Sequence, residues 1–347
     1  MRQKGDYFMT MKKKLLTLFS AAALTLTLAA CTDSEGTSSG DKDYPTSNLT
    51  IVAPSGAGGG WDLTSRSIAK VMNETKLIEK PITVENKPGG GGAVFMATYA
   101  TKEAKNDHML MVKSPPILIN NLKAEGNSPY GYKDTTPLAQ LTKDFGAIVV
   151  RADSPYESLT DLLDAIKADP TALTMAGGSA PGSMDHLVTI LPAYEYGIDP
   201  KAVKYVSYDG GGEAMAALLG NNADAIGTDI STVTPYVKSG DVRVLAVTSP
   251  EKLALEGLEE IPTLYDLGIE AEFTIWRGIF GPKDMSDTAK DYWIEKLTEL
   301  NDKEEWKTEL ERNGWAQDFR VGDDFVKFLE EQEGTITEIL TALGMQK

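Results

Sequence analysis

The sequence predicts an α/β fold in which mostly parallel sheets are flanked by helices. Short apolar runs alternate along the chain with helix-like runs, a pattern typical of α/β units. Three glycine-rich turns each follow an expected strand and precede an expected helix. About 300 residues follow an N-terminal segment of different composition, and this length is enough for two domains.

The expected elements are short and cover most of the chain. We expect strands at residues 49–53, 82–85, 108–112, 147–151, 173–176, 203–207, 224–228 and 242–248. We expect helices after Asp62 and at residues 93–104, 159–168, 184–196, 213–219, 232–239, 287–301, 303–313 and 323–343. Ligands of open α/β sheets bind beyond the carboxyl ends of the strands, so the three glycine turns are expected to face one cleft.

The residues before Cys31 indicate a lipoprotein signal peptide over residues 1–30. Three lysines at 12–14 precede an apolar stretch at 15–30 that ends in small residues. This stretch is too short and wrongly flanked for a typical spanning helix. We therefore expect lipidation of Cys31 and a location on the extracytoplasmic face of a cell membrane. An ordinary signal peptide with a chance cysteine is the alternative, and the single cysteine rules out an intrachain disulfide.

Residues 31–47 are expected to form a flexible tether, because serine, glycine, threonine and aspartate dominate their composition. The chain has a net charge of −17, and residues 1–30 carry +4, which leaves −21 on the remainder. This charge excludes a nucleic-acid partner. It also repels anions at long range, so any anion site must rely on local dipoles and N–H groups.

The three glycine turns are candidate anion sites. They lie at residues 54–62, 86–92 and 177–183. A helix start presents unpaired N–H groups and a partial positive charge, and glycine lets a ligand approach that backbone closely. None of the turns has the Gly-Lys-Ser/Thr ending of a nucleotide P-loop or a true G-x-G-x-x-G, so a small carboxylate is expected rather than a nucleotide.

The candidate ligand-binding residues lie in these turns or beside them. They are Ser55, Gly56, Ala57, Gly58, Gly59, Trp61, Asp62, Ser114, Gly178, Ser179, Ala180, Gly182, Ser183 and Asp229. The backbone of the first turn and the hydroxyls of Ser179 and Ser183 are expected to donate hydrogen bonds to a carboxylate. We expect neither a cofactor nor a metal site, because the chain has two histidines and no EF-hand spacing.

Several candidates have a purely structural alternative. The glycines of the first turn are also suited to a tight turn, and Asp62 and Asp229 are both suited to helix capping. Ser114 is equally suited to a strand-ending turn, and the second glycine turn to close helix–strand packing. Trp61 and Trp276 are expected to pack in the core or at its rim, and His186 to be buried with one hydrogen bond.

The chain resembles the extracytoplasmic substrate-binding receptors of tripartite tricarboxylate transporters from about Asn48 to its C-terminus. The resemblance rests on residues 54–62 (PSGAGGGWD) with Arg66, residues 84–90 (VENKPGG), Gly182-Ser183 with His186-Leu187, and residues 218–220 (LLG), 243–248 (RVLAVT) and 261–264 (IPTL). It implies a two-lobed, type II periplasmic-binding-protein-like fold with crossings near residues 144–150 and 273–281. Lobe one is then residues 48–146 plus 275–347, and lobe two is residues 147–274.

The resemblance also implies a function. Such a receptor captures a small organic anion, for which a di- or tricarboxylate is expected, and delivers it to the permease subunits of a membrane transporter. A ligand-sensing partner of a membrane sensor kinase is the alternative, and it would use the same pocket. We do not expect an enzyme, because Gly-x-Ser-x-Gly does not occur at Ser55, Ser179 or Ser183 and the usual bases are scarce.

Overall fold

The computed structural model describes residues 44–125, 128–255 and 257–347. The expected signal peptide, Cys31 and residues 31–43 of the expected tether lie outside the described residues. The structure is already ordered at Tyr44, four residues before the expected start of the folded part. The Tyr44 hydroxyl donates a hydrogen bond to the carbonyl oxygen of Asp107 (2.7 Å) and accepts one from the Nε1–H of Trp293 (2.6 Å), so residue 44 already belongs to the folded part.

The described part of the chain contains strands and helices in alternation. The strands are β1 (Leu49–Ala53), β2 (Ile82–Asn86), β3 (Met109–Lys113), β4 (Thr136–Arg151), β5 (Met175–Gly177), β6 (Tyr205–Ser207), β7 (Ala225–Asp229), β8 (Val242–Val247), β9 (Thr274–Gly281) and β10 (Ala316–Val321). The helices are α1 (Gly60–Glu74), α2 (Ala93–Thr101), α3 (Pro116–Leu122), α4 (Leu159–Ala168), α5 (Met184–Glu195), α6 (Gly211–Leu219), α7 (Ile230–Ser239), α8 (Asp287–Asn301), α9 (Glu304–Asn313) and α10 (Gly322–Ala342).

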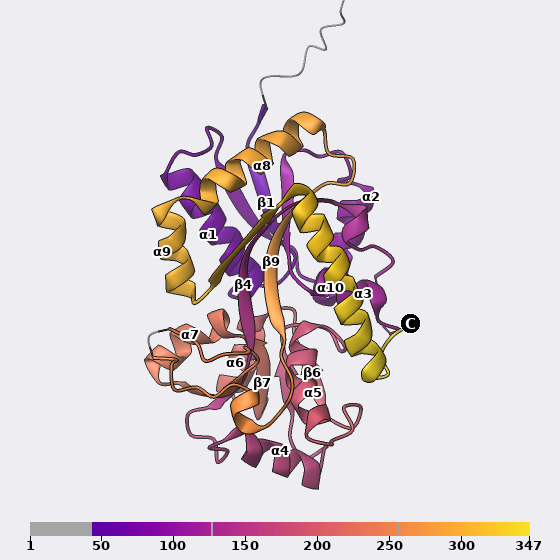
Figure 1. The fold of residues 1–347 in the computed structure, drawn as a ribbon, viewed down its shortest axis with the longest axis vertical. Coiled ribbons are helices and arrows are strands. Elements are labelled where there is room, and N and C mark those ends of the chain that lie inside the picture. Colours follow the sequence, from indigo (N-terminus) through magenta and orange to yellow (C-terminus); the bar gives the residue numbers. More distant parts are fainter. Residues whose placement is uncertain (1–43, 126–127, 256) are drawn as a thin grey trace, which may run out of the picture. The chain divides into compact units, whose positions relative to one another are not determined.

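The long strand β4 connects two groups of strands. Its first part, from Thr136 to Phe145, pairs with β9, and its last part, from Gly146 to Arg151, pairs with β7 and β8. The strand order is β2-β1-β3-β9-β4-β7-β5-β6, and β8 and β10 also pair with β4. The outer pairs are parallel, as expected, whereas β4 and β9 are antiparallel to their neighbours. Figure 1 shows β4 and β9 running side by side between an upper group of elements with α1, α8 and α9 and a lower group with α4 to α7.

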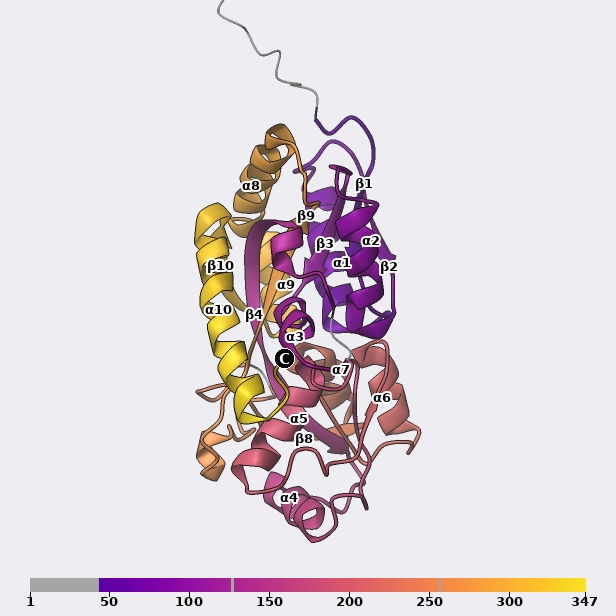
Figure 2. The same cartoon turned by 90° about the vertical axis from the view of Figure 1, so that its right-hand side faces the viewer.

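Helices cover the sheet on both faces. Figure 2 shows α8 and α10 on one side of β4 and α1 and α2 on the other. Buried apolar side chains form three clusters: one includes Ile51 and Trp293, one includes Val149 and Met215, and the largest includes Trp276. Among residues 44–347 without the gaps, none of the helices combines the length and the apolar character that a membrane crossing requires.

The sequence patterns missed four pieces of structure. Helix α3 follows Ser114-Pro115-Pro116, where two prolines indicated a turn, yet proline is well suited to the first position of a helix. The first ten residues of β4 break the apolar pattern because they bury polar side chains such as Gln140 and Thr142. Strand β10 is only half-buried and has no apolar run, and β9 was expected only as a crossing segment.

Candidate ligand-binding site

A small cavity of about 30 Å³ lies where the carboxyl ends of β1, β5 and β7 meet β9. Its lining residues come from glycine turns, helix starts and one strand. They are Ser55, Gly59, Gly60, Trp61, Pro116, Gly178, Ser179, Met184, Asp185, Gly210, Gly211, Asp229 and Arg277. The first and third glycine turns therefore share this cavity, as expected for turns that follow strands of an α/β sheet.

Four helices of eight or more residues begin at the cavity. Helices α1, α5 and α6 start at Gly60, Met184 and Gly211, which line it, and α7 starts directly after the lining residue Asp229. The first N–H groups of a helix have no partner within it, and each helix start carries about half a positive charge. These helix starts therefore favour an anion in the cavity.

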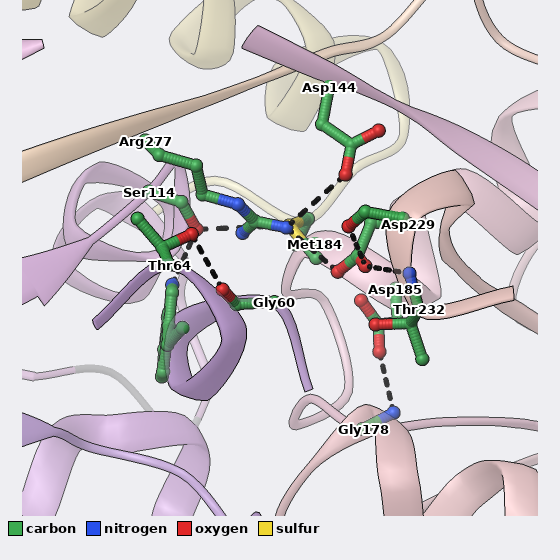
Figure 3. Close-up of polar contacts among 12 residues, drawn as sticks. Gly60, Thr64, Ser114, Asp144, Gly178, Met184, Asp185, Asp229, Thr232 and Arg277 are labelled. Carbon is green, nitrogen blue, oxygen red and sulfur yellow. Dashed lines mark hydrogen bonds and ion pairs between the residues drawn. The ribbon is translucent and has the colours of Figure 1, made fainter. Parts of the chain in front are cut away.

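Arg277 projects from β9 into the cavity and pairs with two carboxylates (Figure 3). Its Nη2 lies 2.8 Å from Oδ2 of Asp229 and 3.8 Å from Oδ2 of Asp144. All three side chains are at most 4% exposed. Nε of Arg277 and Oδ2 of Asp144 have no hydrogen-bond partner among the described residues, so the cluster retains buried polar atoms that a ligand or water can satisfy.

The two carboxylates differ in their affinity for a proton. Burial and the charge of Asp229 raise the pKa of Asp144 to about 7, and Arg277 offsets only part of this. Burial also acts to raise the pKa of Asp229, but the Arg277 guanidinium and hydrogen bonds from Thr232 and Ser231 lower it below its usual range. Asp229 is therefore the ionised partner of Arg277.

The tight approach of Arg277 to α1 requires glycine at position 60. A Cβ on Gly60 would lie 2.1 Å from Nη2 of Arg277 and 2.7 Å from Oδ2 of Asp229, closer than non-bonded atoms approach. The start of α1, the guanidinium and the start of α7 thus form one packed unit.

Asp185 adds a third buried carboxyl group to the cavity. Its Oδ2 accepts the N–H of Gly178 (2.6 Å), and its Oδ1 has no hydrogen-bond partner in the described structure. Burial, with a smaller effect from the charge of Asp229, raises the pKa of Asp185 to about 7. Near neutral pH this group is therefore partly protonated, and its protonated form is a hydrogen-bond donor.

Glycine segments from two parts of the chain close over the cavity. The N–H of Gly56 donates to the carbonyl oxygen of Asp209 (2.8 Å). A Cβ on Gly178 would lie 2.2 Å from the amide nitrogen of Gly211, and a Cβ on Gly59 would lie 3.0 Å from the same atom. Glycine at these positions permits the close contact that leaves a cavity of only about 30 Å³.

Six of the candidate residues from the sequence line the cavity: Ser55, Gly59, Trp61, Gly178, Ser179 and Asp229. Asp229 is also the N-cap of α7, because its Oδ1 accepts the N–H of Thr232 (3.0 Å). The functional and structural interpretations of Asp229 thus apply to the same side chain, through different oxygens.

The other candidates lie outside this lining. Gly56 contacts Asp209, while Ala57 and Gly58 are exposed. Ser114 is buried, and its Oγ accepts a hydrogen bond from the Nε1–H of Trp61 (2.8 Å). Ala180 and Gly182 line a different cavity, described below. Ser183 is at the N-cap position of α5, but its hydroxyl makes no capping bond.

The expected capping role of Asp62 is wrong. Helix α1 begins at Gly60 with Gly59 as its N-cap, three residues earlier than expected. The Asp62 carboxylate accepts hydrogen bonds from the backbone N–H of Gly58 (3.0 Å), the Nε–H of Arg66 (3.0 Å) and the side-chain amide of Asn86 (2.9 Å). These bonds hold the first turn in place from inside the helix, and the neighbouring residues Gly60 and Trp61 line the site instead.

The second glycine turn lies beside the site rather than in it. A Cβ on Gly92 would lie 2.3 Å from Nζ of Lys113 and 3.0 Å from the Trp61 ring, so this turn packs closely against β3 and α1. Lys113 is buried with its Nζ 4.3 Å from the centre of the Trp61 ring, and burial lowers its pKa to about 7. His186 is buried as expected, and its Nδ1 accepts the N–H of Gly182 (2.8 Å).

Sequence reasoning missed seven lining residues: Gly60, Pro116, Met184, Asp185, Gly210, Gly211 and Arg277. Arg277 is the most consequential, because the sequence suggested an anion site built from backbone groups without arginine. One signal was present: an arginine within the otherwise apolar run Thr274–Gly281 is unusual for a buried strand and points to a buried charge partner.

Comparisons with known proteins agree with this architecture. A family model described as "Tripartite tricarboxylate transporter family receptor" matches residues 65–345. A protein of Cupriavidus necator, "UPF0065 protein in gbd 5'region", is 27% identical over 307 residues, which cover 88% of this chain and 90% of that protein.

Two solved structures share the fold. The periplasmic binding protein BugD has a TM-score of 0.78 at 23% identity, over 88% of this chain and 100% of that chain. MatC from Rhodopseudomonas palustris with bound malate has a TM-score of 0.74 at 22% identity, over 86% of this chain and 100% of that chain. The expected two-lobed α/β fold of periplasmic binding proteins is thereby confirmed.

Proposed function

Because the chain belongs to the tripartite tricarboxylate transporter receptor family, we propose that it captures a small organic carboxylate and delivers it to a membrane transporter of that type. The family is one of receptors, so binding without covalent change of the ligand is the activity we assign. A di- or tricarboxylate is the ligand class, and the malate bound to the structurally similar MatC supports a ligand of this kind.

The convergence of four helix starts on Arg277 is the observation that carries the proposal. Helices α1, α5, α6 and α7 begin at the cavity, and Arg277 lies among these starts, paired with Asp229. Their N–H groups and the guanidinium supply the donors that a carboxylate loses when it leaves water. Asp185 adds one more donor in its protonated form, and in that form it carries no charge that opposes an anion.

We propose that lobe one comprises residues 48–146 plus 275–347 and lobe two comprises residues 147–274. This division agrees with the pairing of β4, whose partners change between Phe145 and Gly146. The contact of Gly56 with Asp209 then joins the two lobes, and the cavity of about 30 Å³ between them is smaller than a carboxylate ligand requires. Opening would separate these contacts and admit the ligand, as in hinge closure of other binding proteins.

We further propose that residues 1–30 are a signal peptide, that Cys31 is lipidated, and that the receptor works on the extracytoplasmic face of the membrane beside its permease subunits. The basic, apolar and small-residue pattern before Cys31 supports this anchor. Replacing Cys31 with serine should release the protein from the membrane fraction. Retention of the C31S variant in that fraction would reject the lipid anchor.

A thermal-shift screen tests the proposed ligand class. The panel contains citrate, tartrate, succinate, malate, glutamate, nicotinate and aromatic acids, each against matched ionic strength. A ligand at 100 times its dissociation constant stabilises the folded state by about 2.7 kcal/mol. The proposal predicts that a di- or tricarboxylate raises the melting temperature. A response to amino acids alone would reject that ligand class.

A further inference from the structure

A second and larger cavity lies on the opposite side of the third glycine turn. It has a volume of about 460 Å³. Its lining includes Lys123 directly after α3, Pro181 in the third glycine turn, His186 in the first turn of α5, Lys201, and the C-terminal residues Gly344 and Met345. The central cavity takes Gly178, Ser179 and Asp185 from the same turn and helix, so the two cavities share one wall but no lining residue.

Lys123 is a buried cation that faces this cavity without a carboxylate partner. Lys123 is only 2% exposed, and its Nζ donates a hydrogen bond to the carbonyl oxygen of Pro181 (2.8 Å). No carboxylate of the described residues lies within 4.0 Å of that nitrogen. A buried ammonium has three N–H donors and is costly to bury without a negative charge beside it.

Two more positive or donor groups line the same space. Lys201 is exposed at the rim, and its Nζ lies 3.3 Å from where a Cβ on Gly344 would be. The Nδ1 of His186 accepts a hydrogen bond, which places the ring proton of the neutral imidazole on Nε2. Burial and the charge of Lys123 lower the pKa of His186 to about 4, so the ring is neutral at physiological pH and acts as a donor.

One acidic side chain, Glu125, also lines the cavity, and it is exposed. Its charge is therefore screened by solvent, whereas that of Lys123 is not. The interior of the cavity is positive within a chain whose net charge is −17, which makes the cluster unusual for this protein. A volume of about 460 Å³ is in the range of small-molecule sites and exceeds what a single oxyanion fills.

We propose that this cavity is a second anion-binding site, distinct from the central one, that takes a small dianion, preferably a dicarboxylate, between Lys123 and Lys201. One end of the anion pairs with the buried Lys123 ammonium beside His186, and the other end pairs with Lys201 at the rim. The bound anion contacts α3 and the C-terminal segment on one side and the third glycine turn on the other.

The two histidines of the chain provide a direct test. His186 lines the cavity, whereas His108 precedes β3 and contacts Thr46. The protein is labelled with ¹⁵N-histidine and titrated with sulfate or with succinate, against chloride at equal ionic strength. The proposal predicts a saturable shift of the His186 ring signals with both dianions, tighter for succinate, and an unchanged His108 signal.

A Lys201→Gln variant separates this cavity from the central one. Lys201 is exposed and lines the second cavity but not the central one, so the variant is expected to fold and to bind either dianion about tenfold more weakly. The Gly60→Ala variant alters the central cavity and should leave the His186 titration unchanged. The proposal is rejected if His186 shows no saturable shift, if both histidines shift together, or if Lys201→Gln titrates like the unmodified protein.

Discussion

Nη2 of Arg277 lies 2.8 Å from Oδ2 of Asp229, although the two residues are 48 positions apart in the sequence. Arg277 comes from β9 and Asp229 from the junction of β7 and α7, so this ion pair connects the strand that crosses the sheet to a helix start. Both side chains are buried, and Gly60 of α1 packs directly against the pair. The pair therefore fixes the geometry of the candidate site.

Substitution of Gly60 by alanine should disrupt the site more than the fold. The new Cβ would lie 2.1 Å from Nη2 of Arg277 and must displace the guanidinium or the start of α1. We expect a loss of stability of about 1–3 kcal/mol, as for other overpacked positions, and carboxylate binding at least tenfold weaker. Urea unfolding and calorimetric titration measure the two effects.

Gly334 provides a matched control for this substitution. It lies within α10, is exposed, and a Cβ there would have no neighbouring atom within 4 Å. Alanine at an exposed helix position should stabilise the protein by about 0.5–1 kcal/mol and leave ligand binding unchanged. Equal binding losses in Gly60→Ala and Gly334→Ala would show that the clash with Arg277 is not the cause.

The Arg277–Asp229 pair should be strongly coupled energetically. Asp229→Asn keeps the oxygen that caps α7 but leaves the buried guanidinium with only Asp144 at 3.8 Å. We expect a loss of about 3–5 kcal/mol, because removal of one partner leaves an uncompensated buried charge. Arg277→Met should also destabilise the protein, and the double variant should recover part of the loss.

A double-mutant cycle measures this coupling by urea unfolding of the four proteins. The half-exposed pair of Asp62 and Arg66, whose arginine side chain is 53% exposed, offers a comparison on the same scale. Exposed pairs contribute about 0–1 kcal/mol, so its coupling should be much smaller. Additive effects of Asp229→Asn and Arg277→Met would contradict the structural account of the buried pair.

Asp185 should make the stability of the protein depend on pH in an unusual direction. Its pKa rises from the ordinary value of 3.8 in the unfolded chain to about 7 in the folded protein. Between about pH 4 and pH 7 the carboxyl group is ionised in the unfolded chain but protonated in the folded protein, so folding takes up a proton. The contribution of Asp185 to the free energy of unfolding therefore falls as pH rises from about 4 to about 7. The slope for one such group is up to about 1.4 kcal/mol per pH unit.

Urea unfolding of Asp185→Asn at several pH values checks this contribution. The variant should match the unmodified protein near pH 4 and become progressively more stable than it as pH approaches 7. Asp291→Asn, at an exposed position of α8, is the control and should show no such trend. A difference between Asp185→Asn and the unmodified protein that stays constant with pH would contradict the raised pKa.

Lys113 should make the stability depend on pH with the opposite sign and in a higher pH range. Burial lowers its pKa from the ordinary 10.5 to about 7, so folding releases a proton between these values. Its contribution to stability is therefore lost as pH falls from about 10.5 to about 7. Lys113→Met should be more stable than the unmodified protein at pH 7, and this advantage should shrink by pH 9.5.

Exposed Lys252 is the control for Lys113, and Lys252→Met should have little effect at either pH. The measurement is the midpoint of urea unfolding at pH 7 and pH 9.5. A Lys113→Met variant that is less stable than the unmodified protein at pH 7 would show that the contact of Lys113 with Trp61 outweighs its burial.

Local patterns in the sequence predicted most helices because their ends carry local signals. Helix α4 has the expected bounds, Leu159–Ala168, and begins with a capping box in which the Ser158 side chain accepts the N–H of Asp161. The start of α1 was predicted three residues late, because Asp62 has the residue type of a cap but bonds to Gly58 from within the helix. The glycine turns at the site were predicted for the same local reason.

The charged part of the site could not be predicted in this way. Arg277 meets Asp229 and Asp144 only because β4 and β9 lie side by side, and no spacing in the sequence encodes that pairing. Strand β10 was missed because its side chains are only partly buried and show no apolar alternation. Tertiary contacts over long sequence separations decided these features.

We propose that a carboxylate is held where α1, α5, α6 and α7 begin around Arg277. Calorimetric titration of the unmodified protein, Gly60→Ala and Gly334→Ala with the carboxylate that gives the largest thermal shift tests it most directly. We expect the tightest binding event to have the same affinity in the unmodified protein and in Gly334→Ala, and to be at least tenfold weaker in Gly60→Ala. Equal affinity of all three proteins for that carboxylate would contradict it.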